Sequence, residues 1–257
     1  MLRGNHTTTV ASRRTRQDHL MPSTYRPRTA VVLPGTGSDA DFVARAFTEP
    51  LARRGVRTLA VDPDPRRVVG SYVDALNTAA AAGEPILVGG VSIGAAVALQ
   101  WAATHHEHTA GVLAALPAWT GTAEDAPAAA SARFTATRLR ADGLERVTAE
   151  MVASSPPWLG RALAKSWRSQ WPHLPAALDE ASRYHGPAED DLERIDVPVG
   201  IAAATDDAVH PIEVARTWAA LLPHAGLVTV SLDDIGVDPA VLGYASLRGL
   251  DSVLRRP

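Results

Sequence analysis

The chain has 257 residues, 46% of them hydrophobic, and a formal net charge of −3 at pH 7. This length fits one medium-sized domain with a sizeable core, and no apolar run approaches the roughly 20 residues that span a bilayer. Cysteine is absent, which excludes disulfides, thiolate metal sites and cysteine nucleophiles. We therefore expect a globular protein that does not span a membrane.

Basic residues concentrate in residues 1–28, which hold six arginines and a single acidic residue, Asp18. Such a segment can bind nucleic acid or an anionic membrane, but this one lacks apolar periodicity and interleaved aromatic residues. We expect a disordered basic tail here, with neither nucleic acid nor membrane as a partner. It also lacks the apolar region of a secretory signal, which favours a cytoplasmic protein. Met21 is a candidate start of translation, because the segment that it opens leads directly into the first apolar run.

Short apolar runs alternate with helical patterns in the first half of the chain. The patterns predict strands at 29–33, 56–62, 86–90 and 111–116, with helices at 40–53, 65–82 and 94–104 between them. Parallel strands need crossover connections, and helices supply them on both faces of a sheet. The expected class is therefore α/β, with a mostly parallel sheet.

The alternation stops between residues 118 and 195, where prolines interrupt helical patches. Four of the six tryptophans lie in this stretch, namely Trp119, Trp158, Trp167 and Trp171. So many apolar groups favour a helical cap over 118–195, inserted into a core made of 29–117 and 196–257. The aromatic residues form the cap's own small core or line a pocket, and Trp119 and Trp158 are the candidates for contact with a substrate. Alternation resumes with strands at 197–203 and 227–230 and helices at 211–222 and 239–254.

The third apolar run ends in Gly90-Val91-Ser92-Ile93-Gly94 and continues as a helix. A serine on a tight turn between strand and helix has its hydroxyl directed out of the sheet, and small residues on either side let the two backbones approach. The pattern G-x-S-x-G is typical of a nucleophilic serine, and a plain glycine-rich turn gives the same five residues. Ser92 is the candidate nucleophile.

Two other loops follow predicted strands, Pro34-Gly35-Thr36-Gly37 after the first and Asp206-Asp207 after the fifth. Ligands of open parallel sheets bind outside the carboxyl ends of the strands. We therefore expect these two loops and the turn at Ser92 to meet at one place.

Three motifs resemble those of the α/β-hydrolase fold family. Residues 33–37 resemble the family's oxyanion loop, 90–94 its serine turn and 207–211 its acid loop. The resemblance covers about residues 29–254 and implies an α/β-hydrolase fold with a helical cap.

The resemblance also implies roles for individual residues. Ser92 would attack a carbonyl, the backbone N–H groups of Thr36 and Ile93 would form the oxyanion hole, and Asp207 would orient a histidine base. Asp206 is an alternative to Asp207. Capping of the helix that follows Pro211 is an alternative role for this aspartate pair.

The chain departs from the family where the histidine belongs. The family carries it after the last strand, but residues 231–238 contain none, and His224 precedes that strand. His210, in the acid loop, and His185 or His173, in the insertion, are possible replacements, and the pattern favours none of them. His105, His106 and His108 are expected to cap the end of a helix, with a metal cluster as the less favoured alternative.

The expected function is that of a serine hydrolase acting on a small or hydrophobic ester, thioester or amide, with an incomplete or non-standard triad. The alternatives are a ligand-binding pseudoenzyme, and an isomerase, epimerase or lyase that uses the oxyanion pocket without an acyl-enzyme. Gly35-Thr36-Gly37 lacks the third glycine of a dinucleotide loop and the lysine of a phosphate loop. We expect no metal or organic cofactor and a small-molecule or peptide substrate as partner. The oligomeric state is open.

Overall fold

One parallel sheet carries the fold of the computed structural model, which describes residues 27–255. In that range the sheet has 6 strands in the order β2-β1-β3-β4-β5-β6. Their bounds are Thr29–Leu33 (β1), Arg57–Ala60 (β2), Ile86–Val91 (β3), Thr109–Ala115 (β4), Val199–Ala204 (β5) and Ala225–Val230 (β6). All five neighbouring pairs are parallel. The predicted α/β class is confirmed, whereas the predicted tail over residues 1–28 lies almost wholly outside the described residues.

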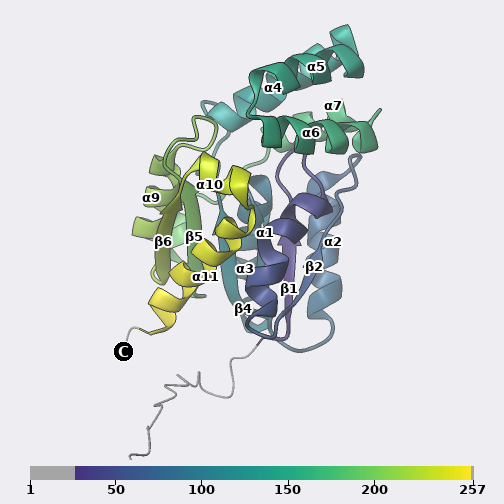
Figure 1. Ribbon diagram of the computed structural model, residues 1–257. Coiled ribbons are helices and arrows are strands. Elements are labelled where there is room, and N and C mark those ends of the chain that lie inside the picture. The colour runs from purple at the N-terminus through teal and green to yellow at the C-terminus, as the bar shows by residue number, and fades with distance from the viewer. Residues whose placement is uncertain (1–26, 256–257) are drawn as a thin grey trace, which may run out of the picture.

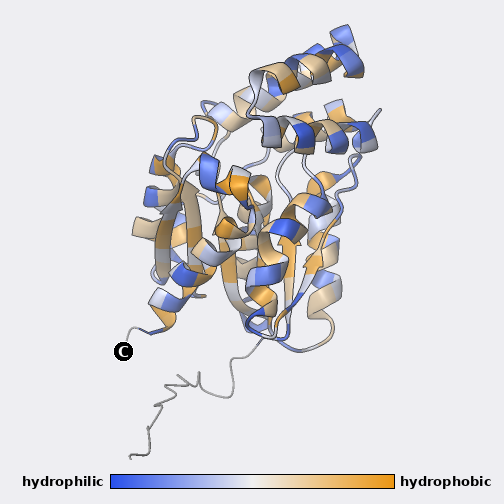
Figure 2. Ribbon diagram, in the orientation of Figure 1, coloured by the Kyte–Doolittle hydropathy of each residue, from blue (hydrophilic) through white to orange (hydrophobic). Residues whose placement is uncertain are grey.

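Helices cover both faces of the sheet (Figure 1). One face packs against α2 (Val68–Ala80), α3 (Ile93–Thr104) and α9 (Ile212–Leu221). The other packs against α1 (Ala40–Ala52) and α11 (Ala240–Leu254). Burial on both faces explains why β3, β4 and β5 are continuous apolar runs rather than alternating ones. Figure 2 shows this concentration of hydrophobic residues on the strands.

The strand order brings two loops together. β1 lies between β2 and β3, so the chain leaves β1 toward one side of the sheet and β3 toward the other. The crevice at such a switch point, outside the carboxyl ends of the strands, is where open α/β sheets bind ligands. The loop after β1, residues 34–39, and the turn after β3 at Ser92 both open into it.

A layer of helices lies above the carboxyl ends of the strands (Figure 1). It consists of α4 (Pro127–Asp142), α5 (Leu144–Ser154), α6 (Pro157–Gln170) and α7 (Leu174–Ser182), and a short α8 (Glu189–Glu193) leads back to β5. We call α4–α7 the helical layer. It has a small core of its own, which includes Leu139, Trp167 and Leu174. These helices lie within residues 118–195, where the sequence predicts an insertion, and their role as a cap stays a prediction.

Two short elements were not anticipated. The 3-10 helix η1 (His106–His108) follows α3, and α10 (Leu232–Val237) follows β6. Ser231 begins α10 with reciprocal bonds: its Oγ accepts the Asp234 N–H at 3.1 Å, and the Asp234 carboxylate accepts the Ser231 N–H at 3.0 Å. Of the histidines expected at the end of α3, His105 bonds through Nδ1 to the Trp101 carbonyl at 2.9 Å.

No helix among the described residues is long and apolar enough to cross a membrane.

Candidate active site

Ser92 occupies a strained turn between β3 and α3. Its backbone has φ 57° and ψ −120°, a conformation that non-glycine residues rarely adopt. Glycines on either side make the turn possible: a Cβ at Gly90 or at Gly94 would lie 2.3 Å from the Leu33 carbonyl oxygen. The predicted need for small residues at these two positions is therefore confirmed. The close approach at Gly90 and Gly94 places the end of β1 directly against the start of α3.

His210 bonds to Ser92 from a different part of the chain. Its Nε2 lies 3.0 Å from Ser92 Oγ, and its Nδ1 lies 2.8 Å from Asp207 Oδ2. With the ring proton on Nδ1, the imidazole donates to the carboxylate and Nε2 accepts the serine hydroxyl proton. The sequence had not favoured His210 over the histidines of the insertion. The structure assigns it to this position, three residues after the predicted acid.

The Asp207 carboxylate also holds its own loop together. Oδ1 accepts the backbone N–H groups of Val209 at 2.8 Å and of His210 at 3.2 Å, while Oδ2 receives the imidazole. Burial raises the pKa of the Asp207 carboxyl, but the hydrogen bond and charge of His210 and these two N–H groups outweigh burial and hold that pKa below its usual value. Asp207 is therefore ionised at neutral pH and favours one orientation of the ring.

The neighbouring aspartate, Asp206, makes a different contact. Asp206 Oδ1 accepts the backbone N–H of Leu232 at 2.8 Å, which ties the loop after β5 to the start of α10. The two candidates for the acid position thus point to different partners, and Asp207 is the one that contacts a histidine. The alternative role as a helix cap is not seen at α9, where Pro211 precedes the first turn without a side-chain cap.

The short helix α10 fills the place where the family's histidine would follow β6. Trp158, from the first turn of α6, lies against it: a Cβ at Gly236 would be 2.4 Å from Trp158 Cδ1. The indole also stacks on Phe42 at a centroid distance of 6.3 Å. The space beside α10 is therefore taken by an aromatic ring from the helical layer.

The loop after β1 lies beside the serine. A Cβ at Gly35 would lie 3.4 Å from Ser92 Cβ and 3.4 Å from the Val91 carbonyl oxygen, so Gly35 lies close to the turn at Ser92. Among the described residues, neither the Thr36 N–H nor the Ile93 N–H has a hydrogen-bond acceptor. Both N–H groups belong to segments that border the serine hydroxyl, one on the loop and one at the N-terminus of α3.

A cavity of about 720 Å³ lies between this constellation and the helical layer. The side of the cavity next to the sheet is lined by Ser92, Thr36 and His210. Most of the remaining lining is apolar and consists of Phe42, Leu116, Val147, Met151, Trp158, Leu159, Leu163, Trp167, Leu178 and Ile235. Away from the acid loop, the charged lining residues are Arg138 and Glu150, and these two pair with each other at 2.7 Å. The cavity presents apolar surface to a ligand.

The two tryptophans predicted to contact a substrate lie in different surroundings. Trp158 lines the cavity, whereas Trp119 does not. Its indole N–H donates to the Tyr184 carbonyl at 3.2 Å, and its ring packs with alanines after β4, including Ala123 and Ala129. Trp119 therefore does not line this cavity, because its polar atom and its apolar face are both satisfied elsewhere, and its contact with a substrate stays a prediction. Trp167, which the sequence did not single out as a contact, lines the cavity instead.

Comparison with solved structures shows that the chain has the α/β-hydrolase fold. It is similar to a thermophilic esterase from Thermogutta terrifontis (20% identity, 90% of this chain and 92% of that chain, TM-score 0.66). It is also similar to MenH from S. aureus (16%, 89% and 95%, 0.67) and to the enol-lactonase from Burkholderia xenovorans LB400 (17%, 80% and 83%, 0.59). No family model and no curated protein sequence matches the chain.

Proposed function

We propose that the protein is a serine hydrolase that cleaves a carboxylic ester, thioester or amide, with Ser92 as nucleophile, His210 as general base and Asp207 as the orienting carboxylate. One observation carries the proposal: His210 contacts Ser92 Oγ through Nε2 and the Asp207 carboxylate through Nδ1. That order of groups is the arrangement in which a serine hydroxyl is activated for acyl transfer. The triad is non-standard because its base and its acid come from one loop.

In this mechanism Ser92 Oγ attacks the carbonyl carbon and its proton passes to His210 Nε2. The negative charge on the carbonyl oxygen is received by the N–H groups of Thr36 and Ile93, which form the oxyanion hole, and the positive end of α3 adds to it. The tetrahedral intermediate then expels the alcohol, thiol or amine, which takes the proton from His210. Water attacks the acyl-enzyme by the same route and restores the serine.

The substrate that suits the cavity has an apolar acyl or alkyl group. The lining is dominated by aliphatic and aromatic side chains, and its distal charges, Arg138 and Glu150, neutralise each other. A carboxylate on the substrate would find no unpaired cation there and would lose its hydration. Two of the similar structures carry the names esterase and enol-lactonase, and both names denote hydrolysis of an ester bond.

Covalent labelling tests the proposal. We expect wild-type protein to react with an activated fluorophosphonate at Ser92, with loss of fluoride, and Ser92→Ala to give no adduct. His210→Gln should slow labelling and ester hydrolysis by a factor on the order of 10³–10⁶, because removal of the base leaves only the oxyanion hole and binding.

His224→Gln is the matched control, since His224 is half-exposed and pairs with Asp196 at 3.1 Å, away from the cavity. It should retain the wild-type rate. A folded wild-type protein that neither labels nor hydrolyses esters would point to the ligand-binding alternative. Solvent deuterium exchange into a carbonyl substrate that Ser92→Ala retains would point to the isomerase, epimerase or lyase alternative.

A further inference from the structure

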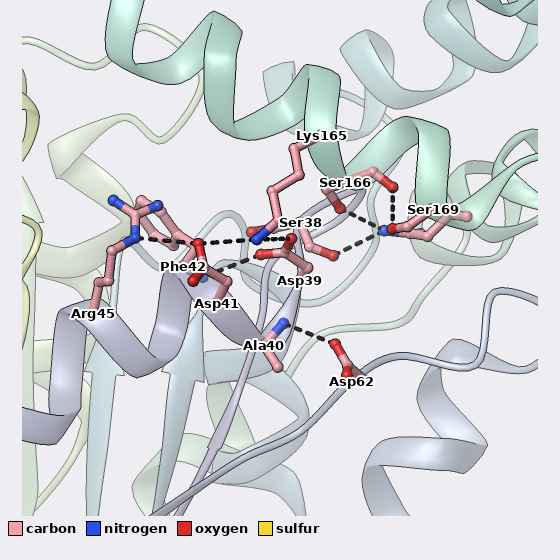
Figure 3. A network of polar contacts seen from close by, with 11 residues as sticks. Ser38, Asp39, Ala40, Asp41, Phe42, Arg45, Asp62, Lys165, Ser166 and Ser169 are labelled. Atoms are coloured by element: carbon pink, nitrogen blue, oxygen red, sulfur yellow. Dashed lines mark hydrogen bonds and ion pairs between the residues drawn. The ribbon is translucent and has the colours of Figure 1, made fainter.

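The last two turns of α6 lie over the loop that joins β1 to α1. Three side chains make the contact: Lys165 reaches Asp39 and Asp41, Trp167 covers Gly37, and Gln170 bonds to Ser38. Figure 3 shows Lys165 and Ser166 facing residues 38–41. The helical layer is therefore joined to the segment that carries the Thr36 N–H.

Gln170 makes the buried polar contact in this group. Its side chain is 5% exposed, and its Nε2 donates to the Ser38 carbonyl at 2.9 Å and to Ser166 Oγ at 2.8 Å. The Ser38 carbonyl selects this orientation of the amide, because a flip would place Gln170 Oε1 against the carbonyl oxygen and neither atom could donate. Gln170 is thus a rigid support for the carbonyl of Ser38.

The other end of the loop is held from the core. The Tyr72 hydroxyl, at the fully buried Tyr72, donates to the Pro34 carbonyl at 3.0 Å. Between the two anchors, the Ser38 N–H donates to the Gly35 carbonyl at 3.0 Å and closes a tight turn around Thr36. The Thr36 peptide is therefore fixed by α2 on one side and by α6 on the other.

Packing adds a second restraint from the same helix. Gly37 has φ +70°, and a Cβ there would lie 2.9 Å from Trp167 Nε1. Trp167 is 5% exposed, and its indole occupies the space that a side chain at residue 37 would need. Glycine is required at this position both by its backbone angle and by the ring above it.

The ion pairs of Lys165 carry less of the restraint. Its ammonium lies 3.6 Å from Asp39 and 3.2 Å from Asp41, but its side chain is 61% exposed. Exposed ion pairs contribute little, because solvent screens them and the long side chain loses freedom. The buried side-chain amide of Gln170 therefore restrains the position of the loop more than the ion pairs of Lys165 do.

We propose, on the basis of the hydrolase function inferred above, that Gln170 is a positioning residue: through the Ser38 carbonyl it holds the Thr36 N–H in place as an oxyanion donor. An oxyanion donor contributes only while it is fixed at the position that the developing charge will occupy. The helical layer thereby supplies part of the transition-state machinery as well as the cavity wall.

The test is Gln170→Met, which keeps the length of the side chain and removes the donor. We expect kcat for an apolar p-nitrophenyl ester to fall roughly tenfold to a hundredfold. This loss does not exceed the decrease in kcat that usually follows removal of one oxyanion donor. KM should stay within about twofold, because the groups that bind the apolar chain are unchanged. Hydrogen exchange of the Ser38 amide should accelerate about tenfold, since its bond to Gly35 depends on the same loop position.

Ser169→Ala is the control: Ser169 is exposed at the same end of α6, and among residues 27–255 its hydroxyl bonds only to the Ser166 carbonyl. It should match wild type in kcat and in Ser38 exchange. If Gln170→Met destabilises the fold, Gln170→Glu provides a second variant of the same size without a donor at neutral pH. Equal kcat and equal Ser38 exchange in Gln170→Met and Ser169→Ala would overturn the proposal, as would a rise in KM that accounts for the whole loss.

The two proposals fail in different ways. If wild-type protein gives no fluorophosphonate adduct and no hydrolysis, the hydrolase function is wrong and with it the catalytic role of Gln170, whatever the Ser38 exchange shows. If wild type is labelled at Ser92 but Gln170→Met is labelled at the same rate, the hydrolase function stands and the role of Gln170 is overturned.

Discussion

His210 lies three residues after Asp207, and one carboxylate contacts both its ring and its backbone: Oδ2 is 2.8 Å from Nδ1, and Oδ1 accepts the His210 N–H at 3.2 Å. The same oxygen accepts the Val209 N–H at 2.8 Å. The aspartate therefore fixes the histidine twice, by its position along the chain and by its ring orientation.

The first prediction concerns this carboxylate. Asp207→Asn should lower kcat by about 10⁴, because an amide facing Nδ1 no longer selects the tautomer in which Nε2 is free to accept a proton. Asp206→Asn is the matched control, since Asp206 bonds to the Leu232 N–H and to no histidine; its kcat should stay within about tenfold of wild type. Steady-state hydrolysis of one ester by the three proteins measures both effects. Equal losses in the two variants would contradict the assignment of the acid.

The second prediction concerns acid stability. The folded pKa of Asp207 is below its ordinary value of 3.8, so the ionised carboxylate stabilises the fold above that pH, and this stabilisation is lost as the pH falls through the folded pKa. The difference in unfolding free energy between wild type and Asp207→Asn should therefore be constant from neutral pH down to about 5 and shrink below about 4. Urea denaturation at a series of pH values measures it. A difference that grows toward low pH would show that the pKa is shifted in the opposite direction.

The third prediction concerns the contact between α10 and the helical layer. Gly236→Ala places a methyl group 2.4 Å from Trp158 Cδ1, so the indole must move. We expect a loss of about 1–3 kcal/mol in stability from overpacking and a higher KM for apolar esters. Fluorophosphonate labelling of Ser92 should stay within about tenfold of wild type, because the three residues of the proposed triad are not displaced.

Val237→Ala is the control for that variant, because Val237 is 88% exposed on the same short helix. Its effect on stability should lie within about 0.5 kcal/mol. Unchanged KM in Gly236→Ala would show that Trp158 does not contact the substrate.

The fourth prediction concerns chain length. For p-nitrophenyl esters from acetate to octanoate, kcat/KM should rise with each methylene until the apolar lining is filled, at up to about 0.8 kcal/mol per buried CH₂. An ester of matched length that ends in a carboxylate should react at least tenfold more slowly, because the distal cation Arg138 is already paired with Glu150. A preference for the carboxylate ester would contradict the proposed substrate class.

The fold could be predicted from the sequence because its elements differ in periodicity. Continuous apolar runs such as 86–90 and 111–116 became central strands, and the loops that follow strands became neighbours through the parallel topology. Ser92, Thr36, Ile93 and Asp207 are accordingly found at one edge of the sheet, where their loops were expected to meet.

The proposed base, His210, could not be predicted by the same route. Its place depends on how the turn at 207–210 directs each side chain, and the turn is closed by a carboxylate that accepts two backbone N–H groups. A signal was nevertheless present: an aspartate followed three residues later by a histidine, directly after a strand, with no histidine after the last strand. Trp119 and Trp158 could not be separated either, because an aromatic residue in a helical insertion gives no direction for its ring.

The contacts of α6 with the loop after β1 have a practical consequence for engineering. Replacing residues 127–182 with helices from another protein would be expected to change the rate of the chemical step as well as the range of substrates, because the graft would also remove the amide that supports Ser38. Residues 231–238 are the more favourable place for redesign. They hold no group of the proposed triad. A loop exchanged there that keeps the backbone N–H bonded to Asp206 would reshape one wall of the cavity and leave residues 207–210 in place.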